Sequence, residues 1–259
     1  MLGSIAGDII GSVYEFTNVK PEYDFPLFVE NSEFTDDTVL TIALADSILN
    51  NIPYIDKLRE YYSRYPDAGY GNMFHSWART KDPRPYNSWG NGSAMRTSPI
   101  GWAYNDLETI LQKAKESAEV THNHPEGIKG AQATAAAIFL ARTNNSKKEI
   151  KEFIEKNFNY NLELEIEELR KTYSFNESCQ DTVPQAIFTF LVSKSFEDSI
   201  RKAIYIGGDS DTLACINGSI AEAFYRGVPE MITQEVYKRL NDKLIVIVNK
   251  FSEKFLKNK

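Results

Sequence analysis

Two short segments, near opposite ends of this 259-residue chain, combine aspartates with threonines. The first is Thr35-Asp36-Asp37-Thr38, directly before a helical pattern that begins at Val39. Helix capping accounts for one of these acids, because a carboxylate is stabilised at a helix N-terminus. Two adjacent carboxylates repel each other unless a cation offsets their charge. The segment therefore has two interpretations, a capped helix and a cation site.

The second segment, Gly-Gly-Asp-Ser-Asp-Thr at residues 207–212, lies between two helical patterns. Asp209 and Asp211 would point to nearly opposite sides of a regular helix, so they converge on one ion only at an irregular turn. The two glycines can supply that turn. Oxygen ligands of this kind suit Mg²⁺, Mn²⁺ or Ca²⁺ rather than zinc, which prefers Cys and His. The Asp-x-Asp motif of phosphohydrolases is a weaker alternative, because that motif follows a buried strand and residues 196–206 have a helical pattern.

A glycine-rich segment, Ser-Trp-Gly-Asn-Gly-Ser-Ala-Met-Arg at residues 88–96, carries groups that can contact a ligand. Its glycines allow the backbone to approach a ligand closely. Ser88 and Asn91 offer neutral hydrogen bonds, and Trp89 offers a face for stacking. An elaborate turn between helices is the alternative interpretation.

Two histidines, His122 and His124, follow a further helical pattern and precede Pro125. The pair has three interpretations: metal ligands, a catalytic acid or base, and a polar loop that connects helices. A loop position favours contact with a substrate for His122.

The elements that must position these residues are predicted to be helices. Alternating strand patterns are scarce, and apolar residues recur at helical spacing over residues 39–49, 107–114, 131–141, 196–206 and 213–225. Two segments rich in Gly, Pro, Asn and Ser are predicted to be long loops, residues 80–101 and 121–130. The acidic stretch at residues 163–168 is predicted to be a solvated helix face. We find no linker and no repeat, so residues 1–259 are expected to form a single domain.

Composition and charge argue against two classes of function, that of membrane proteins and that of general nucleic-acid binders. Hydrophobic residues make up 42% of the chain and charged residues 25%, and no apolar run approaches the roughly 18 residues of a membrane helix. We therefore expect no membrane association. The net charge of −7 gives no basic stripe, which argues against general nucleic-acid binding.

Cysteine use and the N-terminal segment indicate a cytoplasmic protein. Cys179 and Cys215 lie in segments that are predicted to be buried helices, where free thiols are common. The first residues lack the basic region of a signal peptide and carry Asp8 and Glu15, so we expect them to belong to the mature fold. A monomer is the default expectation.

Five motifs in the same order resemble the ADP-ribosylglycohydrolase family over most of the chain. They are Gly7-Asp8-Ile9-Ile10-Gly11 with Glu15, Thr35-Asp36-Asp37-Thr38, Gly90-Asn91-Gly92-Ser93-Ala94-Met95-Arg96, Thr121-His122 and Gly207-Gly208-Asp209-Ser210-Asp211-Thr212. The resemblance implies an all-α globular fold with a binuclear site for two Mg²⁺ or Mn²⁺ ions between the acidic segments.

The resemblance also implies roles for single residues. By position, the metal ligands would be Thr35, Asp36, Asp37, Asp209, Asp211 and Thr212. Contacts to the substrate would come from Ser88, Trp89, Asn91, Gly92 and His122. The candidate acid and base groups are Glu15, Asp36 and Asp37.

The activity implied by the resemblance is metal-dependent hydrolysis of the N- or O-glycosidic bond between ADP-ribose and a modified acceptor. The partner would be an ADP-ribosylated protein or a small ADP-ribose conjugate, and the motifs do not define whether the acceptor is arginine, serine or a small molecule. A non-catalytic ADP-ribose-binding protein and a metal-dependent phosphohydrolase are the alternatives. All six implied metal-binding positions carry oxygen-bearing side chains, which favours the enzyme.

Overall fold

The computed structural model describes residues 1–15 and 20–256, whose regular secondary structure is α-helical. Within them there is no β-strand, and an isolated antiparallel bridge joins Gly90 to Ser178. The helices are α1 (Leu2–Gly11), α2 (Asp36–Asn50), α3 (Tyr54–Arg64), α4 (Asn72–Arg79), α5 (Gly92–Met95), α6 (Ser98–Ala103), α7 (Leu107–Glu119), α8 (Pro125–Arg142), α9 (Lys147–Phe158), α10 (Ile166–Thr172), α11 (Cys179–Leu191), α12 (Phe196–Tyr205), α13 (Ser210–Phe224), α14 (Glu230–Arg239) and α15 (Asp242–Phe255). The predicted all-α fold class is confirmed.

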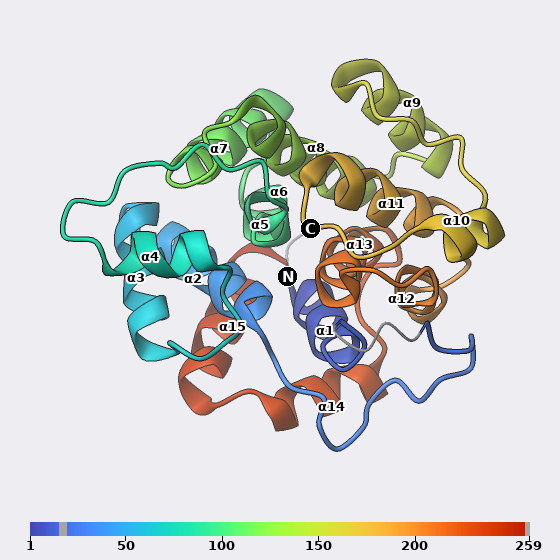
Figure 1. Ribbon diagram of the computed structural model, residues 1–259, viewed down its shortest axis with the longest axis horizontal. Coiled ribbons are helices and arrows are strands. Elements are labelled where there is room, and N and C mark those ends of the chain that lie inside the picture. Colours follow the sequence, from blue (N-terminus) through green and yellow to red (C-terminus); the bar gives the residue numbers. More distant parts are fainter. Residues whose placement is uncertain (16–19, 257–259) are drawn as a thin grey trace.

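Helices α1 and α13 lie side by side near the centre of the molecule (Figure 1). Glycines at every fourth position of α1 allow this close approach. A Cβ atom at Gly7 would lie 2.0 Å from the carbonyl oxygen of Ala214, and one at Gly11 would lie 2.5 Å from the Cα atom of Asp211. Because no side chain separates the two backbones, the end of α1 lies directly against the first turn of α13.

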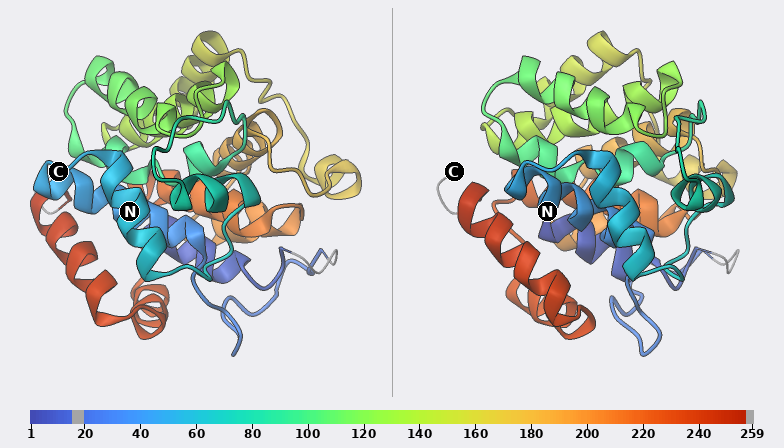
Figure 2. Two further views of the ribbon diagram at one scale, coloured as in Figure 1. Left: turned by 60° about the vertical axis from the view of Figure 1, so that its left-hand side comes forward. Right: turned by 90° about the vertical axis from the view of Figure 1, so that its left-hand side faces the viewer.

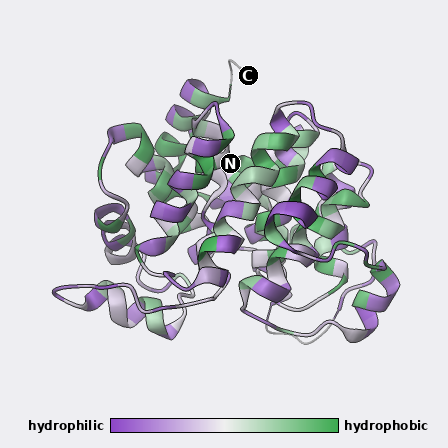
Figure 3. Ribbon diagram, turned by 90° about the horizontal axis from the view of Figure 1, so that it is seen from above, coloured by the Kyte–Doolittle hydropathy of each residue, from purple (hydrophilic) through white to green (hydrophobic). Residues whose placement is uncertain are grey.

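The hydrophobic core surrounds this helix pair. Most helices carry both hydrophobic and hydrophilic residues along their length (Figure 3), as expected for helices with one buried face. Helix α8 has small side chains at its buried positions, where Ala131, Ala133 and Ala135 to Ala137 are all fully buried. These small side chains let α5, α6, α7, α11 and α13 pack against α8. The helix predicted over residues 131–141 is therefore confirmed.

The two predicted long loops are partly helical, which corrects the sequence prediction. Residues 80–101 contain α5 and most of α6, and α8 begins at Pro125 within residues 121–130. Proline occupies one of the first two positions of both α6 and α8, where its missing N–H costs no helical hydrogen bond. The acidic stretch at residues 163–168 is helical only from Ile166 onward.

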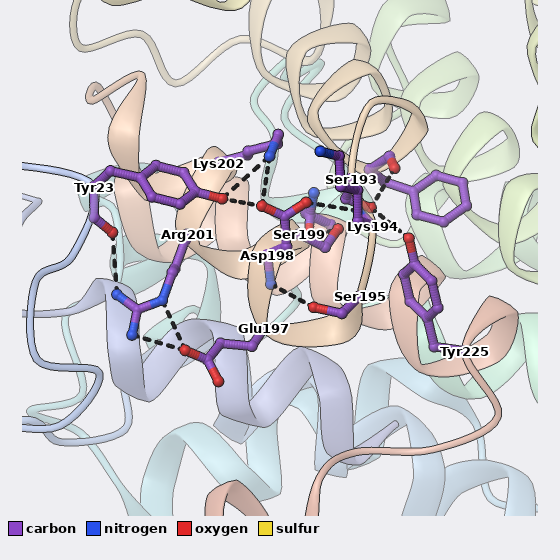
Figure 4. Close-up of polar contacts among 12 residues, drawn as sticks. Tyr23, Ser193, Lys194, Ser195, Glu197, Asp198, Ser199, Arg201, Lys202 and Tyr225 are labelled. Atoms are coloured by element: carbon purple, nitrogen blue, oxygen red, sulfur yellow. Dashed lines mark hydrogen bonds and ion pairs between the residues drawn. The ribbon is translucent and has the colours of Figure 1, made fainter.

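A polar network fixes the path of the chain between α1 and α2 (Figure 4). Arg201 of α12 donates hydrogen bonds to the carbonyl oxygens of Tyr23, at 3.1 Å, and Phe25, at 2.6 Å. Asp198, also on α12, contacts the hydroxyl of Tyr23 and accepts from Lys202 Nζ at 2.5 Å. These contacts hold the middle of the segment that connects α1 to α2.

The remaining features of the fold are an outer helix, two buried cysteines and helices too short or too polar to cross a membrane. Helix α15 runs along one outer side of the molecule in both views of Figure 2 and packs on α2. Cys179 and Cys215 are buried free thiols, as predicted. None of the described helices is both long and apolar enough to cross a bilayer.

Candidate metal centre and substrate cleft

Three carboxylates converge beside the junction of α1 and α13. One oxygen from each of Glu15, Asp209 and Asp211 lies within 4.8 Å of the other two. Burial, reinforced by the charge of Asp209, raises the pKa of Glu15 to about 8 and holds the pKa of Asp211 well above its usual range. Acids that repel one another in this way form a group that can hold a metal ion.

An irregular turn brings Asp209 and Asp211 together, as the sequence predicted. Gly207 and Gly208 adopt the left-handed region, with φ values of 76° and 85°. Asp209 then precedes α13 as its N-cap residue, whereas Asp211 lies in the first helical turn. Because the backbone of Asp209 is not helical and that of Asp211 is, the two side chains do not point to opposite sides as they would within one regular helix.

The N-terminus of α2 meets the N-terminus of α13. Thr212 Oγ1 lies 3.2 Å from Asp37 Oδ2, to which it donates a hydrogen bond. Asp37 Oδ1 is buried and has no hydrogen-bond partner among the described residues. Burial and the charge of Asp8 hold the pKa values of Asp36 and Asp37 well above the usual range. The structure therefore places the two predicted acidic segments at one location.

Asp8, in the motif at residues 7–11, is a site residue that was not among the predicted metal ligands. Its carboxylate is fully buried and accepts hydrogen bonds from the Thr35 hydroxyl at 2.7 Å, the Thr35 N–H at 3.0 Å and the Thr38 N–H at 3.1 Å. Thr35 Oγ1 also accepts from the Asp37 N–H at 3.3 Å, so Thr35 caps α2. An acid enclosed by apolar residues and glycines of α1 was the available signal.

A cleft of about 430 Å³ opens over the acidic residues. Its lining includes Glu15, Asp36, Asp37, Asp209, Asp211 and Thr212 on the acidic side and Tyr86, Ser88, Gly90, Asn91, Gly92, Arg96, His122 and Glu177 on the other. Four of the five predicted substrate contacts thus line the cleft, namely Ser88, Asn91, Gly92 and His122.

Trp89 does not line this cleft. Its side chain is 53% exposed, and the indole lies edge-on against the imidazole of His124, with 5.5 Å between ring centroids. His124 itself caps α8, because its Nδ1 accepts from the Glu126 N–H at 3.1 Å. The polar-loop interpretation therefore describes His124.

Asn91 is turned toward the acidic residues. Its Nδ2 donates to Asp209 Oδ2 at 2.7 Å and to Thr182 Oγ1 at 3.1 Å. Its backbone N–H donates to the carbonyl oxygen of Glu177 at 2.7 Å. One amide hydrogen of the side chain therefore orients Asp209, and the other is bonded to Thr182.

A hydrogen-bond chain orients the imidazole of His122. Arg96 Nη2 donates to Thr121 Oγ1 at 2.8 Å, and Thr121 Oγ1 lies 2.7 Å from His122 Nδ1. Burial, aided by the charge of Arg96, lowers the pKa of His122 well below its usual value, so the ring is neutral. Thr121 Oγ1 and His122 Nδ1 share one hydrogen bond whose donor depends on the tautomer of the ring, and His122 Nε2 lies next to Gly90 and Gly92.

The cleft continues in two directions. A cavity of about 810 Å³ shares Glu15, Asp36 and Gly69 with it. A groove of about 550 Å³ shares Asn72, Met73 and Tyr86 with it and is also lined by Trp77 and Pro83. The cleft therefore adjoins two further spaces, of which the cavity also contacts the acidic residues.

The helices pack around an acidic cluster that can hold a metal ion, and a polar cleft lies beside this cluster. The family model described as ADP-ribosylglycohydrolase matches residues 1–259, and the chain belongs to that family. A solved structure titled ADP-ribosylglycohydrolase-related protein complex superposes with a TM-score of 0.73 at 22% identity, over 98% of this chain and 95% of that one. That likeness shows the shared fold.

Named relatives come from animals, archaea and bacteria. The ADP-ribosylhydrolase ARH3 of Xenopus tropicalis is 28% identical over 300 residues, covering 87% of this chain and 85% of that protein. An uncharacterized protein of Archaeoglobus fulgidus is 29% identical over 271 residues, covering 89% and 88%. The ADP-ribosylarginine hydrolase Tri1 of Pseudomonas putida is 24% identical over 272 residues, covering 92% and 72%.

Proposed function

We propose that this chain hydrolyses the glycosidic bond between ADP-ribose and a modified acceptor, with divalent cations bound at the acidic cluster. The observation that carries the proposal is the convergence of Glu15, Asp209 and Asp211 at the floor of a cleft lined by a glycine-rich segment. Membership of the ADP-ribosylglycohydrolase family supports the reaction class.

The residues present fit a pair of Mg²⁺ or Mn²⁺ ions. All the side chains around the cluster offer oxygen, and the buried Asp37 Oδ1 lacks a partner among the described residues. The proposed ligands are Thr35, Asp36, Asp37, Asp209, Asp211 and Thr212, with Glu15 beside them. When bound, such ions would neutralise the carboxylates, fix ribose hydroxyls and lower the pKa of a water molecule.

The cleft residues would bind the ADP-ribose part of the substrate. His122 offers its ring nitrogen Nε2 for a hydrogen bond, Ser88 a hydroxyl and Gly92 an unobstructed backbone. The adjoining groove presents Met73, Trp77 and Tyr86, whose apolar faces suit the adenine base. Contact between the substrate and the exposed Trp89 stays a prediction.

Bond cleavage would separate the acceptor from the anomeric carbon through an oxocarbenium-like state, as in other glycoside hydrolyses. Glu15, Asp36 and Asp37 are the candidate proton carriers, because all three are carboxylates that line the cleft. We also propose a monomeric, cytoplasmic protein without membrane or general nucleic-acid partners.

The test is release of free ADP-ribose from arginine-linked and serine-linked peptides and from acetylated ADP-ribose. We expect release from one of these acceptors with Mg²⁺ and none with EDTA. Binding of ADP-ribose without release from any acceptor would instead indicate a non-catalytic binding protein. Release of inorganic phosphate would indicate the phosphohydrolase alternative.

A further inference from the structure

The 810 Å³ cavity next to the acidic residues has no role in the function proposed above. We call it the outer cavity. Two chain segments form most of its wall, residues 31–36 and 64–69, and its remaining lining is Ser12, Val13, Glu15 and Arg239. Because it shares Glu15, Asp36 and Gly69 with the substrate cleft, the two spaces meet at the acidic cluster. A substrate with ADP-ribose in the cleft and its scissile bond at the cluster would extend its acceptor into the outer cavity.

The outer cavity carries negative charge that the protein does not compensate. The carboxylates of Glu33 and Asp67 are exposed and make no ion pair or hydrogen bond within residues 1–15 and 20–256. The two arginines of the lining are already paired. Arg64 contacts Glu60, and Arg239 lies 2.6 Å from Glu235 and donates to the carbonyl oxygen of Ser32 at 3.1 Å.

The wall of the outer cavity also offers aromatic faces. The rings of Phe34 and Tyr65 lie edge to face with their centroids 6.0 Å apart, and both side chains are half-buried. The hydroxyl of Tyr65 donates to Asn241 Oδ1 at 3.1 Å, which holds that ring in place. Carboxylates beside aromatic faces favour a planar cation, because a guanidinium can stack on a ring while it bonds to an acid.

We propose that the outer cavity receives the acceptor and selects a guanidinium, so that the substrate is ADP-ribosylated arginine. This inference rests on the function proposed above. In the reaction, the bond between the anomeric carbon and the guanidinium nitrogen breaks, and its electron pair stays on nitrogen. Water oxygen bonds to the anomeric carbon, and the proton that the water loses restores the charge of the guanidinium.

The experiment compares two peptides of identical flanking sequence, one ADP-ribosylated on arginine and one on serine. With Mg²⁺ present, we expect wild-type kcat/KM to be at least roughly tenfold higher on the arginine peptide. The double variant Glu33→Gln, Asp67→Asn should raise KM for the arginine peptide roughly tenfold and change the serine reaction less than about twofold. Agmatine, which carries a guanidinium but no ADP-ribose, should compete with the arginine peptide on wild type and more weakly on the double variant.

A matched control is the double variant Asp56→Asn, Glu108→Gln, which removes the same charges from exposed first turns of α3 and α7. It should behave as wild type on both peptides, and thermal melting verifies that both double variants are folded. Equal wild-type activity on the two peptides, or an equal loss on both in the cavity variant, overturns the inference while the proposed function stands. Absence of ADP-ribose release from either peptide overturns the proposed function and this inference with it.

Discussion

Asp8 of α1 holds Thr35, at the N-cap of α2, by two hydrogen bonds: one from the Thr35 hydroxyl at 2.7 Å and one from its N–H at 3.0 Å. The carboxylate is fully buried, and α1 is itself packed backbone to backbone against α13. One side chain therefore ties the position of Asp36 and Asp37 to the position of Asp209 and Asp211. We regard Asp8 as a positioning residue for the acidic cluster.

The variant Asp8→Asn should weaken binding of divalent cations. An amide nitrogen cannot accept from Thr35 or Thr38, so the start of α2 loses part of its support. Residues that orient metal ligands without binding the metal typically contribute about 10- to 100-fold to the affinity for the metal. We expect Asp8→Asn to lower the affinity by a factor in that range. Calorimetric titration with Mn²⁺ measures it. An affinity within about twofold of wild type would contradict the positioning role.

The variant Gly7→Ala should destabilise the fold. The new Cβ atom would lie 2.0 Å from the carbonyl oxygen of Ala214, so α1 and α13 must separate. Overpacking of this kind costs about 1–3 kcal/mol or more in the free energy of unfolding. Gly71→Ala is the matched control, because a Cβ atom there meets nothing within 4 Å. Chemical denaturation measures the free energy of unfolding of both variants. An equal decrease in the two variants would contradict the close packing of α1 against α13.

The imidazole of His122 should stay neutral between pH 6 and 8, because burial and Arg96 lower its pKa well below 6.5. The unfolded chain then binds the proton more readily than the folded chain below about pH 6.5. The stabilisation that comes from the neutral imidazole of His122 is therefore complete above about pH 6.5. It is lost as the pH falls toward the pKa of His122 in the folded chain. His122→Gln should reduce this loss of stability between pH 6.5 and 5.

Nitrogen NMR shifts of His122 give an independent measurement. We expect a neutral ring with the proton on Nε2, because a Thr121 hydroxyl that accepts from Arg96 can donate its own hydrogen to Nδ1. A ring that titrates near pH 6.5, or that carries its proton on Nδ1, would contradict the hydrogen-bond chain from Arg96.

The sequence predicted the parts of the site that depend on local geometry. The pair Gly207 and Gly208 indicated an irregular turn, and that turn is what lets Asp209 and Asp211 converge. The capping pattern at Thr35 and Asp36 likewise predicted the helix that begins there. The all-α class followed from helical spacing in segments long enough to show it.

Features that depend on packing between distant segments were not predictable from local pattern. The role of Asp8 requires knowledge that α1 lies against α2, and the outer cavity requires residues 31–36 and 64–69 to face one another. Asn91 was predicted to contact a ligand and lines the cleft, but its hydrogen bonds to Asp209 and Thr182 join segments distant in the sequence and were not predicted. The four-residue α5 is too short for its periodicity to be read from sequence.

The most direct test of the central claim is calorimetric titration of Mn²⁺ into metal-free protein, for wild type and for Asp209→Asn. The account predicts two ions per wild-type chain and a loss of at least one in the variant, because Asp209 and Asp211 share the cluster with Glu15. Asp56→Asn, an exposed site on α3, should bind as wild type does. Absence of Mn²⁺ binding by wild type, or unchanged binding by Asp209→Asn, would contradict a metal centre at these residues.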